Sequence, residues 1–286
     1  MSNSYVGRFK IIALDIDGTL LDRSGRLRPA TVGAVRRAAD AGMRPVLCTG
    51  RRYRRALPIA EELGVDAPLV CNSGALVKTP DDHRTLWRAD IDLKLVTELL
   101  ALYVEREEFA VSFTDRSPSE PDFIVARGCS GRPLVDDYLD QNRTHADVVA
   151  TWLDDPGSTG SHYHVCAIGD RPTMLDLRDE VEARFPGRFT TFVQRSPRYL
   201  GTMCEVLRRD ASKWSALLHV AELWGVLPAE IVAVGDDRND VPMIVGAGLG
   251  IAMGHAPAEV RGKADLVALD EENDGLARVI DDVLLK

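Results

Sequence analysis

Paired cysteines and long hydrophobic runs are both missing from this sequence of 286 residues. Its five cysteines are far apart and include no CxxC pair, which argues against a disulfide framework and a zinc knuckle. No apolar stretch approaches the roughly 20 residues that cross a bilayer, and the first residues lack the apolar stretch of a secretion signal. We therefore expect a cytoplasmic protein without membrane association, in which the cysteines are reduced and mostly buried.

Positive charge is also in short supply. The 35 lysines and arginines are outnumbered by 44 aspartates and glutamates, which gives a net charge of −9. Nucleic acids and anionic membranes both require a cationic surface, so neither is expected as a partner. An acidic protein that handles an anionic substrate must instead gather positive charge at one local site.

Short apolar runs and helical stretches alternate at both ends of the chain. Near the start, strands are predicted over residues 9–17, 44–50 and 67–74, with helices over 29–42 and 51–64 between them. The runs have too little polar alternation for half-exposed strands, and the alternating order is typical of a parallel sheet covered on both faces. Because the same alternation returns late in the chain, we predict an α/β fold with a doubly wound parallel sheet built from two separate segments.

The segment between these two parts has a different order of elements. It begins with a helical stretch over residues 92–108 and continues with further strands and helices, in the order αββαβαββ. We interpret it as an inserted α+β domain. The predicted organisation is therefore a core formed by residues 1–88 and 207–286, with the inserted domain over residues 89–206.

The strongest chemical signal lies at the end of the first predicted strand. Asp15 and Asp17 follow a buried apolar run and precede the glycine turn of the sequence DIDGT. Open α/β sheets bind ligands in the crevice beyond the carboxyl ends of their strands. One aspartate could simply cap the following helix, whereas two carboxylates at this position need another reason.

A second acidic cluster follows the strand predicted over residues 230–236. Its sequence from Gly235 to Asp240 is GDDRND, and parallel topology places it at the same edge of the sheet as Asp15. Oxygen ligands without paired cysteine or histidine favour Mg²⁺ over Zn²⁺. Aspartate and asparagine are also common in capped turns, so this segment alone leaves both interpretations open.

Two further segments could bind phosphate. Thr49 and Gly50 precede a helix whose free amides suit an anion, although an ordinary capping threonine explains Thr49 equally well. Arg51, beside them, could also reach the site, while the other arginines of the run 51–55 are expected on a solvated face. Lys213 opens a late helix, where a lysine is usually solvated. Combined with the carboxylates, these groups complete what phosphoryl transfer through an aspartyl-phosphate requires.

This combination resembles the haloacid dehalogenase superfamily of phosphatases. The first motif of that family, DxDGT, matches Asp15 to Thr19, and its second, a Ser or Thr at a strand end, matches Thr49. The family's conserved lysine is similar to Lys213, and its acidic motif GDxxND matches Gly235 to Asp240. The inserted domain and the sequence GIAMGHA near the end resemble the Cof-type subfamily, which carries a large cap.

The resemblance implies the catalytic and metal-binding roles. Asp15 would be the nucleophile, and Asp17 would protonate the leaving oxygen and then deprotonate the hydrolytic water. Mg²⁺ would be bound by the side chains of Asp15 and Asp236 and by the backbone carbonyl of Asp17. The inserted cap would close over the substrate and exclude water.

The resemblance also implies roles around the phosphoryl group and the metal. Thr49, Gly50 and Lys213 would bind the phosphoryl oxygens. Asn239 and Asp240 would orient the metal shell or its waters.

Three positions depart from the usual family pattern. Ser73 interrupts an Asn-Gly-Ala sequence, Trp214 follows the lysine where glycine is common, and His255 stands where asparagine is usual. None of them is the nucleophile, the acid/base or a metal carboxylate. We expect them to affect substrate handling more than the reaction.

The sequence therefore predicts a Mg²⁺-dependent phosphatase of small soluble phosphomonoesters, with sugar phosphates favoured by the resemblance. Two alternatives stay open. One is a sugar phosphomutase with the same chemistry at Asp15, and the other is a catalytically quiet, phosphate-binding regulator. Neither the physiological substrate nor the oligomeric state follows from the sequence.

Overall fold

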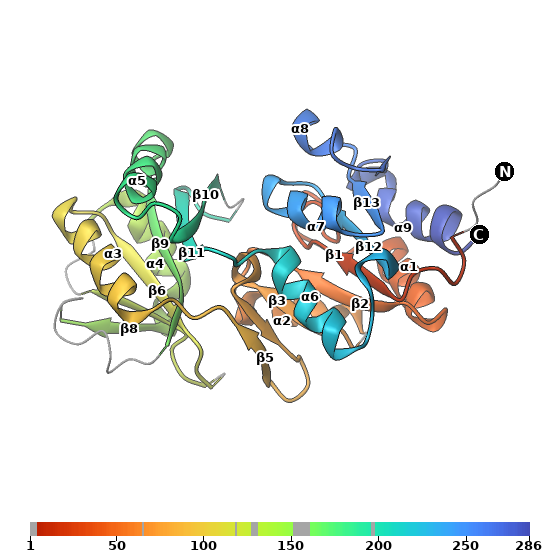
Figure 1. Ribbon diagram of the computed structural model, residues 1–286, viewed down its shortest axis with the longest axis horizontal. Coiled ribbons are helices and arrows are strands. Elements are labelled where there is room, and N and C mark those ends of the chain that lie inside the picture. Colours follow the sequence, from red (N-terminus) through yellow and green to blue (C-terminus); the bar gives the residue numbers. More distant parts are fainter. Residues whose placement is uncertain (1–4, 65, 118, 127–130, 151–160, 196–197) are drawn as a thin grey trace. The chain divides into compact units, whose positions relative to one another are not determined.

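The chain folds into two compact units. The first is formed by residues 1–87 and 212–286 and the second by residues 88–211. The boundary predicted after residue 206 falls within a strand of the second unit, β11 (Thr202–Arg208). The computed structural model shown in Figure 1 describes residues 5–64, 66–117, 119–126, 131–150, 161–195 and 198–286.

An eight-stranded sheet forms the centre of the first unit, in the order β14-β13-β12-β1-β2-β3-β4-β5. The strands from β14 to β3 run parallel, while β4 runs antiparallel to β3. The strands are β1 (Ile11–Leu14), β2 (Arg44–Cys48), β3 (Leu69–Cys71), β4 (Leu76–Lys78), β5 (Thr85–Arg88), β12 (Ile231–Gly235), β13 (Leu249–Ala252) and β14 (Leu266–Val267).

Helices cover both faces of this sheet. The chain moves in opposite directions from the centre through β1-β2-β3 and β12-β13-β14, and right-handed crossovers then place the connecting helices on opposite faces. On one face α6 and α7 bury apolar side chains such as Leu217 and Met243 against Ile11 and Ala233. The predicted doubly wound α/β fold is confirmed. The helices are α1 (Pro29–Asp40), α2 (Tyr53–Leu63), α6 (Lys213–Leu223), α7 (Val241–Gly246), α8 (Ala258–Arg261) and α9 (Gly275–Val279).

The central position of β1 explains why distant acidic residues meet. In the parallel register, Leu14 of β1 lies opposite Val234 of β12. The amide of Asp15 also donates a hydrogen bond to the carbonyl of Val234, at 3.0 Å. Residues that follow β1 and β12 therefore leave the sheet side by side, although more than 200 positions separate them in the sequence.

The second unit contains a six-stranded sheet in the order β10-β11-β9-β6-β7-β8. Helices α3 and α5 pack on it through a core that includes Leu99, Tyr103 and Leu177. Its remaining elements are α3 (Leu93–Glu105), β6 (Ala110–Thr114), β7 (Phe123–Ala126), α4 (Pro133–Asn142), β8 (Ala146–Val149), β9 (His162–Gly169), α5 (Arg171–Arg184) and β10 (Phe189–Arg195).

Within its described residues, this unit has one strand more than the predicted order αββαβαββ. The additional strand, β8, has the short sequence ADVV and lies at the edge of the sheet, parallel to β7. Its partly exposed side chains give neither an apolar run nor a clear alternation, so the sequence offers little signal for it.

The buried cysteines agree with the sequence analysis. Cys48, Cys71, Cys166 and Cys204 are buried, free thiols, whereas Cys129 lies outside the described residues. Among the described residues, no helix is long and apolar enough to cross a membrane.

Candidate active site

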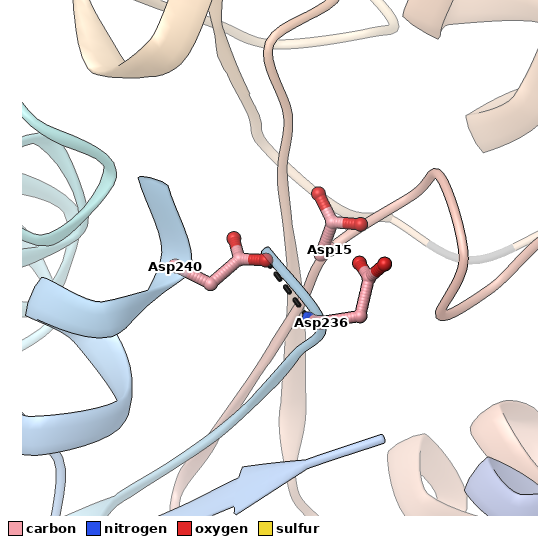
Figure 2. A group of neighbouring side chains, drawn as sticks. All are labelled: Asp15, Asp236 and Asp240. Carbon is pink, nitrogen blue, oxygen red and sulfur yellow. Dashed lines mark hydrogen bonds between the residues drawn. The ribbon is translucent and has the colours of Figure 1, made fainter. Parts of the chain in front are cut away.

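Two acidic loops meet at the carboxyl edge of the first unit's sheet. Asp15 directly follows β1, and Asp236 directly follows β12. Figure 2 shows their carboxylates next to each other, with Asp240 nearby on the turn that leads into α7. One carboxylate oxygen from each of these three residues lies within 4.8 Å of the others. The structure thus brings together the two acidic motifs that the sequence predicts at one edge.

A glycine allows the two loops to approach this closely. Gly18 has a φ of +83°, and a Cβ atom at this position would lie only 2.4 Å from Oδ2 of Asp236. Any larger residue would both strain the backbone and push the second carboxylate away. Gly18 is therefore needed both for the turn of DIDGT and for the close approach of the Asp236 carboxylate.

Lys213 reaches these carboxylates from the first position of α6. Its ammonium Nζ lies 2.7 Å from Oδ1 of Asp15 and 2.6 Å from Oδ1 of Asp240. The helix begins with a capping box, in which Ser212 and Ser215 bond each other's backbone amides. Since the side chain is only 1% exposed, Lys213 is not the solvated lysine usually found at a helix start.

The loop after β3 fixes the start of α6. Asn72, Ser73 and Gly74 have consecutive positive φ values of 49°, 55° and 99°. A Cβ at Gly74 would lie 2.1 Å from the backbone carbonyl of Ser212, so the loop and the helix start are in direct backbone contact. The amide of Ser73 donates to the carbonyl of Thr49 at 3.0 Å. This loop therefore links the second motif to the lysine.

Burial and charge act in opposite directions on this cluster. Burial by itself would lower the pKa of Lys213, but the carboxylates of Asp15 and Asp240 outweigh it and raise this pKa. Burial raises the pKa of Asp15 well above its ordinary value, and the ammonium of Lys213 opposes that shift. Lys213 is consequently a permanent positive charge at the site.

Asp240 has both oxygens occupied. Oδ1 accepts from Lys213, while Oδ2 accepts the backbone amides of Asp236 and Asp237, each at 3.0 Å. By contrast, Oδ2 of Asp15 and Oδ1 of Asp236 are buried and accept no hydrogen bond. Asp240 thus holds the second loop and the lysine in place, and the two unbonded oxygens belong to the residues predicted as side-chain metal ligands.

These residues fit a divalent cation. Three carboxylates lie around one ammonium, with the imidazole of His255 beside Asp236, so carboxylates outnumber the permanent positive charge in a buried site. Two carboxylate charges 4.8 Å apart repel each other by about 3 kcal/mol at an effective dielectric constant of about 20. Carboxylate oxygens are the ligands that Mg²⁺ prefers. The side chains of Asp15 and Asp236 could therefore hold the ion.

Asp17 lies outside the lysine cluster and is paired with Arg51. The guanidinium donates from Nε to Oδ2 at 2.7 Å and from Nη2 to Oδ1 at 2.5 Å. This bidentate pair fixes the rotamer of Asp17, whose side chain remains 37% exposed. Arg51 thus reaches the site, as its position beside Thr49 indicated. The expectation of a solvated face for the other arginines of the run is wrong for Arg52, which is buried.

Thr49, Gly50 and Asn239 are placed at the same edge. Thr49 is fully buried at the end of β2, and its Oγ1 accepts the amide of Arg51 at 3.0 Å. A hydroxyl that accepts one bond still has its own proton to donate to a phosphoryl oxygen. Gly50 lies between these two residues, ahead of α2, which starts at Tyr53 without a side-chain cap. Asn239 is buried in the turn Arg238–Asp240.

The three departures from the family pattern have different outcomes. Ser73 belongs to the loop that supports α6. The ring of Trp214 packs against Gly246 of α7, where a Cβ would lie 2.3 Å from it, and therefore fills the helix interface. His255 contacts the site itself, with Nε2 3.3 Å from Oδ2 of Asp236. This contact was not predicted; the position of His255 between Gly254 and Ala256, where the family usually has asparagine, was the one sign of it in the sequence.

Comparison with known proteins gives an independent result. Residues 12–280 match the family of haloacid dehalogenase-like hydrolases. The match spans both segments of the first unit and the inserted second unit.

Several relatives are phosphatases. A pyridoxal phosphate phosphatase of Escherichia coli is 26% identical, over 95% of this chain and 97% of the relative. A phosphatase of Bacillus subtilis is 27% identical, over 96% and 100%. An HMP-PP phosphatase of Yersinia pseudotuberculosis is 27% identical, over 88% and 86%.

Solved structures share the fold. A haloacid dehalogenase-like hydrolase from Bacteroides thetaiotaomicron matches with a TM-score of 0.78 and 23% identity, over 96% of this chain and 99% of that one. Another from B. subtilis matches with a TM-score of 0.78 and 25% identity, over 96% and 100%.

Proposed function

Since the chain belongs to the haloacid dehalogenase-like hydrolases and is a phosphatase of the Cof type, we propose that it hydrolyses small soluble phosphomonoesters in a Mg²⁺-dependent reaction, with Asp15 as the nucleophile. One observation carries this proposal. Lys213 binds one oxygen of Asp15 at 2.7 Å, while the other oxygen is buried without a hydrogen bond, as is Oδ1 of the neighbouring Asp236.

The first step is attack by the carboxylate of Asp15 on the phosphorus atom. A bond forms between a carboxylate oxygen and phosphorus, and the bond from phosphorus to the ester oxygen breaks. Lys213 reduces the repulsion between the carboxylate and the phosphate dianion, because its charge lies between Asp15 and Asp240. Thr49 donates its hydroxyl proton to a phosphoryl oxygen, and the amide of Gly50 is proposed to do the same.

Asp17 is proposed to move the protons. It gives one to the departing ester oxygen and then takes one from the water that hydrolyses the aspartyl-phosphate. Its position two residues after the nucleophile, with the side chain 37% exposed, leaves it open to a leaving group. To act first as the acid, Asp17 carries a proton on one oxygen and releases the Arg51 hydrogen bond there. The ionised carboxylate that then takes a proton from water is the form that Arg51 positions through both oxygens.

The proposed metal ligands are the side chains of Asp15 and Asp236 and the backbone carbonyl of Asp17. Mg²⁺ bound there would offset the negative charge of the phosphoryl oxygens. Asp240 and Asn239 are proposed to support these ligands. Asp240 contributes by holding the backbone of Asp236 and the ammonium of Lys213.

The proposed substrates are small phosphorylated metabolites, with sugar phosphates as the class to examine first. Relatives at 26% and 27% identity are a pyridoxal phosphate phosphatase and an HMP-PP phosphatase, so other small phosphate esters belong in the same screen.

The test is a phosphate-release screen with Asp15→Asn. The wild type is incubated with a panel of metabolites, with Mg²⁺ or with EDTA, and free phosphate is measured. We expect Mg²⁺-dependent release that Asp15→Asn lowers at least about 1,000-fold, because the amide is a poor nucleophile. Asp281→Asn, which changes a surface aspartate paired with Arg37, is the control. Retention of a near-normal rate by Asp15→Asn would refute the assignment.

A further inference from the structure

Asp236 has two oxygens with different surroundings. Oδ1 is buried and accepts no hydrogen bond. Oδ2 lies 3.3 Å from Nε2 of His255 and next to the open side of Gly18. The contact at Oδ2 is therefore the hydrogen bond that can orient this carboxylate and leave Oδ1 for a cation.

A buried carboxylate lies behind His255. The second nitrogen of the imidazole, Nδ1, lies 2.5 Å from Oε2 of Glu271, whose side chain is only 4% exposed; this is an ion-pair contact in which neither atom makes a hydrogen bond. The other oxygen of Glu271 accepts a hydrogen bond from Nε of Arg23 at 3.0 Å. The backbone carbonyl of Glu271 accepts from Arg28, also at 3.0 Å. A continuous chain of contacts thus runs from Asp236 through His255 and Glu271 to Arg23.

The backbone around His255 is fixed independently of Asp236. A tight turn follows β13, in which the amide of Ala256 donates to the carbonyl of Met253 at 3.0 Å. Arg261 of α8 donates to the carbonyls of Gly254 and Ala256, the residues on either side of the histidine. The imidazole is therefore presented to Asp236 by a turn that is already in place.

We propose that His255 is a positioning residue for the cation site. Held by Glu271, it fixes the carboxylate of Asp236 through Oδ2 and so keeps Oδ1 directed at the cation. The inference rests on the proposed Mg²⁺ site. Groups that orient a metal ligand in this way typically change metal affinity by about 10- to 100-fold when they are removed.

The test compares three variants with the wild type. His255→Ala removes both contacts, His255→Gln retains a donor for Asp236 but loses Glu271, and Glu271→Gln weakens the support from behind. The control is Glu230→Gln, which also removes one carboxylate, but at the amino end of β12, where Glu230 pairs with Lys10 at 2.6 Å.

Three quantities are measured for each protein. Isothermal titration calorimetry gives the Mg²⁺ dissociation constant without substrate, phosphate release gives kcat at saturating Mg²⁺, and urea unfolding in EDTA gives the stability. We expect His255→Ala to raise the dissociation constant about 10- to 100-fold while kcat stays within about threefold. His255→Gln should recover part of the affinity, Glu271→Gln should lie between the two, and Glu230→Gln should match the wild type.

An unchanged Mg²⁺ dissociation constant in His255→Ala would overturn the inference. A lower urea midpoint beside that unchanged constant would leave His255 with a purely structural role. A wild type that binds no Mg²⁺ would contradict the proposed function, and the inference with it. If the wild type and His255→Ala both bind Mg²⁺ with the same affinity, the inference fails but the proposed function stands.

Discussion

Lys213 is the residue on which the charge balance of the site depends. Its ammonium is buried between Asp15 and Asp240, so replacing it with an apolar residue leaves two carboxylates without their partner. Removal of one member of a buried ion pair typically costs about 3–5 kcal/mol. The loss of one such charge near the reacting phosphate lowers turnover about 100- to 1,000-fold.

We therefore predict that Lys213→Met lowers both the free energy of unfolding, by about 3 kcal/mol, and the rate of phosphate release, by at least about 100-fold. Urea unfolding and steady-state kinetics measure the two effects. Lys10→Met is the control, because Lys10 pairs with Glu230 on the surface and should cost less than about 1 kcal/mol. Normal turnover by Lys213→Met would show that the lysine is only structural.

His164 gives a prediction on pH, in the second unit. Full burial lowers the pKa of this imidazole from 6.5 to about 3. Oε2 of Glu205 lies 4.0 Å from Nε2, too far for a hydrogen bond that would offset the burial. Above pH 6.5 the ring is neutral in both the folded and the unfolded chain. Below it, the unfolded chain binds a proton that the folded chain excludes, so stability falls as pH falls.

The expected loss is up to about 1.4 kcal/mol for each pH unit between pH 6.5 and pH 3. His164→Gln should remove this contribution and give a shallower pH dependence of the free energy of unfolding. The measurement is urea unfolding of both proteins between pH 7 and pH 4.5. Hydrogen exchange of the backbone amides of β9, which contains His164, reports the same loss of stability locally. Parallel curves for the two proteins would mean that His164 is protonated as readily in the folded state as in the unfolded chain.

Single residues differ in how far the sequence could predict them. Asp15, Asp236 and Lys213 stand out because parallel strand ends must share one edge of the sheet, so their meeting follows from topology. The pair of His255 and Glu271 could not be predicted in the same way. These residues belong to two separate turns, and no periodic pattern indicates that a turn after β13 and a turn after β14 place their side chains 2.5 Å apart.

Among the elements, the loop Asn72–Gly74 has the clearest effect on the site. It has no catalytic group of its own, yet it touches the backbone of Ser212 and so determines where α6 begins. Gly74 has a φ of +99°, and no other residue type can bring its backbone this close to the helix start.

Gly74→Ala should displace the start of α6 and with it the ammonium of Lys213. We expect a loss of more than about 3 kcal/mol in stability together with lower turnover, because backbone strain and a steric clash both contribute. Gly42→Ala is a matched control, since Gly42 has a similar φ of +92° but no atom within 4 Å of the added Cβ. It should cost only about 1–2 kcal/mol and leave turnover intact. Equal effects of the two substitutions, measured by urea unfolding and phosphate release, would contradict the account of this loop.

The elements that the sequence missed share a physical cause. Strands β4, β5 and β8 are at most four residues long and lie at or near the edges of their sheets. Short edge strands are specified by pairing with a neighbour more than by their own pattern, so their sequences contain little information. The central strands of the first unit were predictable because burial on both faces makes each of them a continuous apolar run.

At the scale of the whole molecule, the order of elements was enough to predict one sheet from two distant segments with a domain inserted between them. The fold class and the phosphatase family are confirmed by the match over residues 12–280 and by the TM-scores of 0.78. The substrate could not be predicted, because specificity depends on individual side chains whose arrangement does not follow from the spacing of motifs.

The central claim is that Asp15 itself receives the phosphoryl group. The most direct test is to quench the enzyme during turnover, reduce the acyl phosphate with borohydride and identify the modified residue by mass spectrometry. The account predicts homoserine at position 15, formed only when substrate and Mg²⁺ are both present, and none in Asp15→Asn. Modification at another residue, or steady turnover with position 15 unmodified, would contradict it.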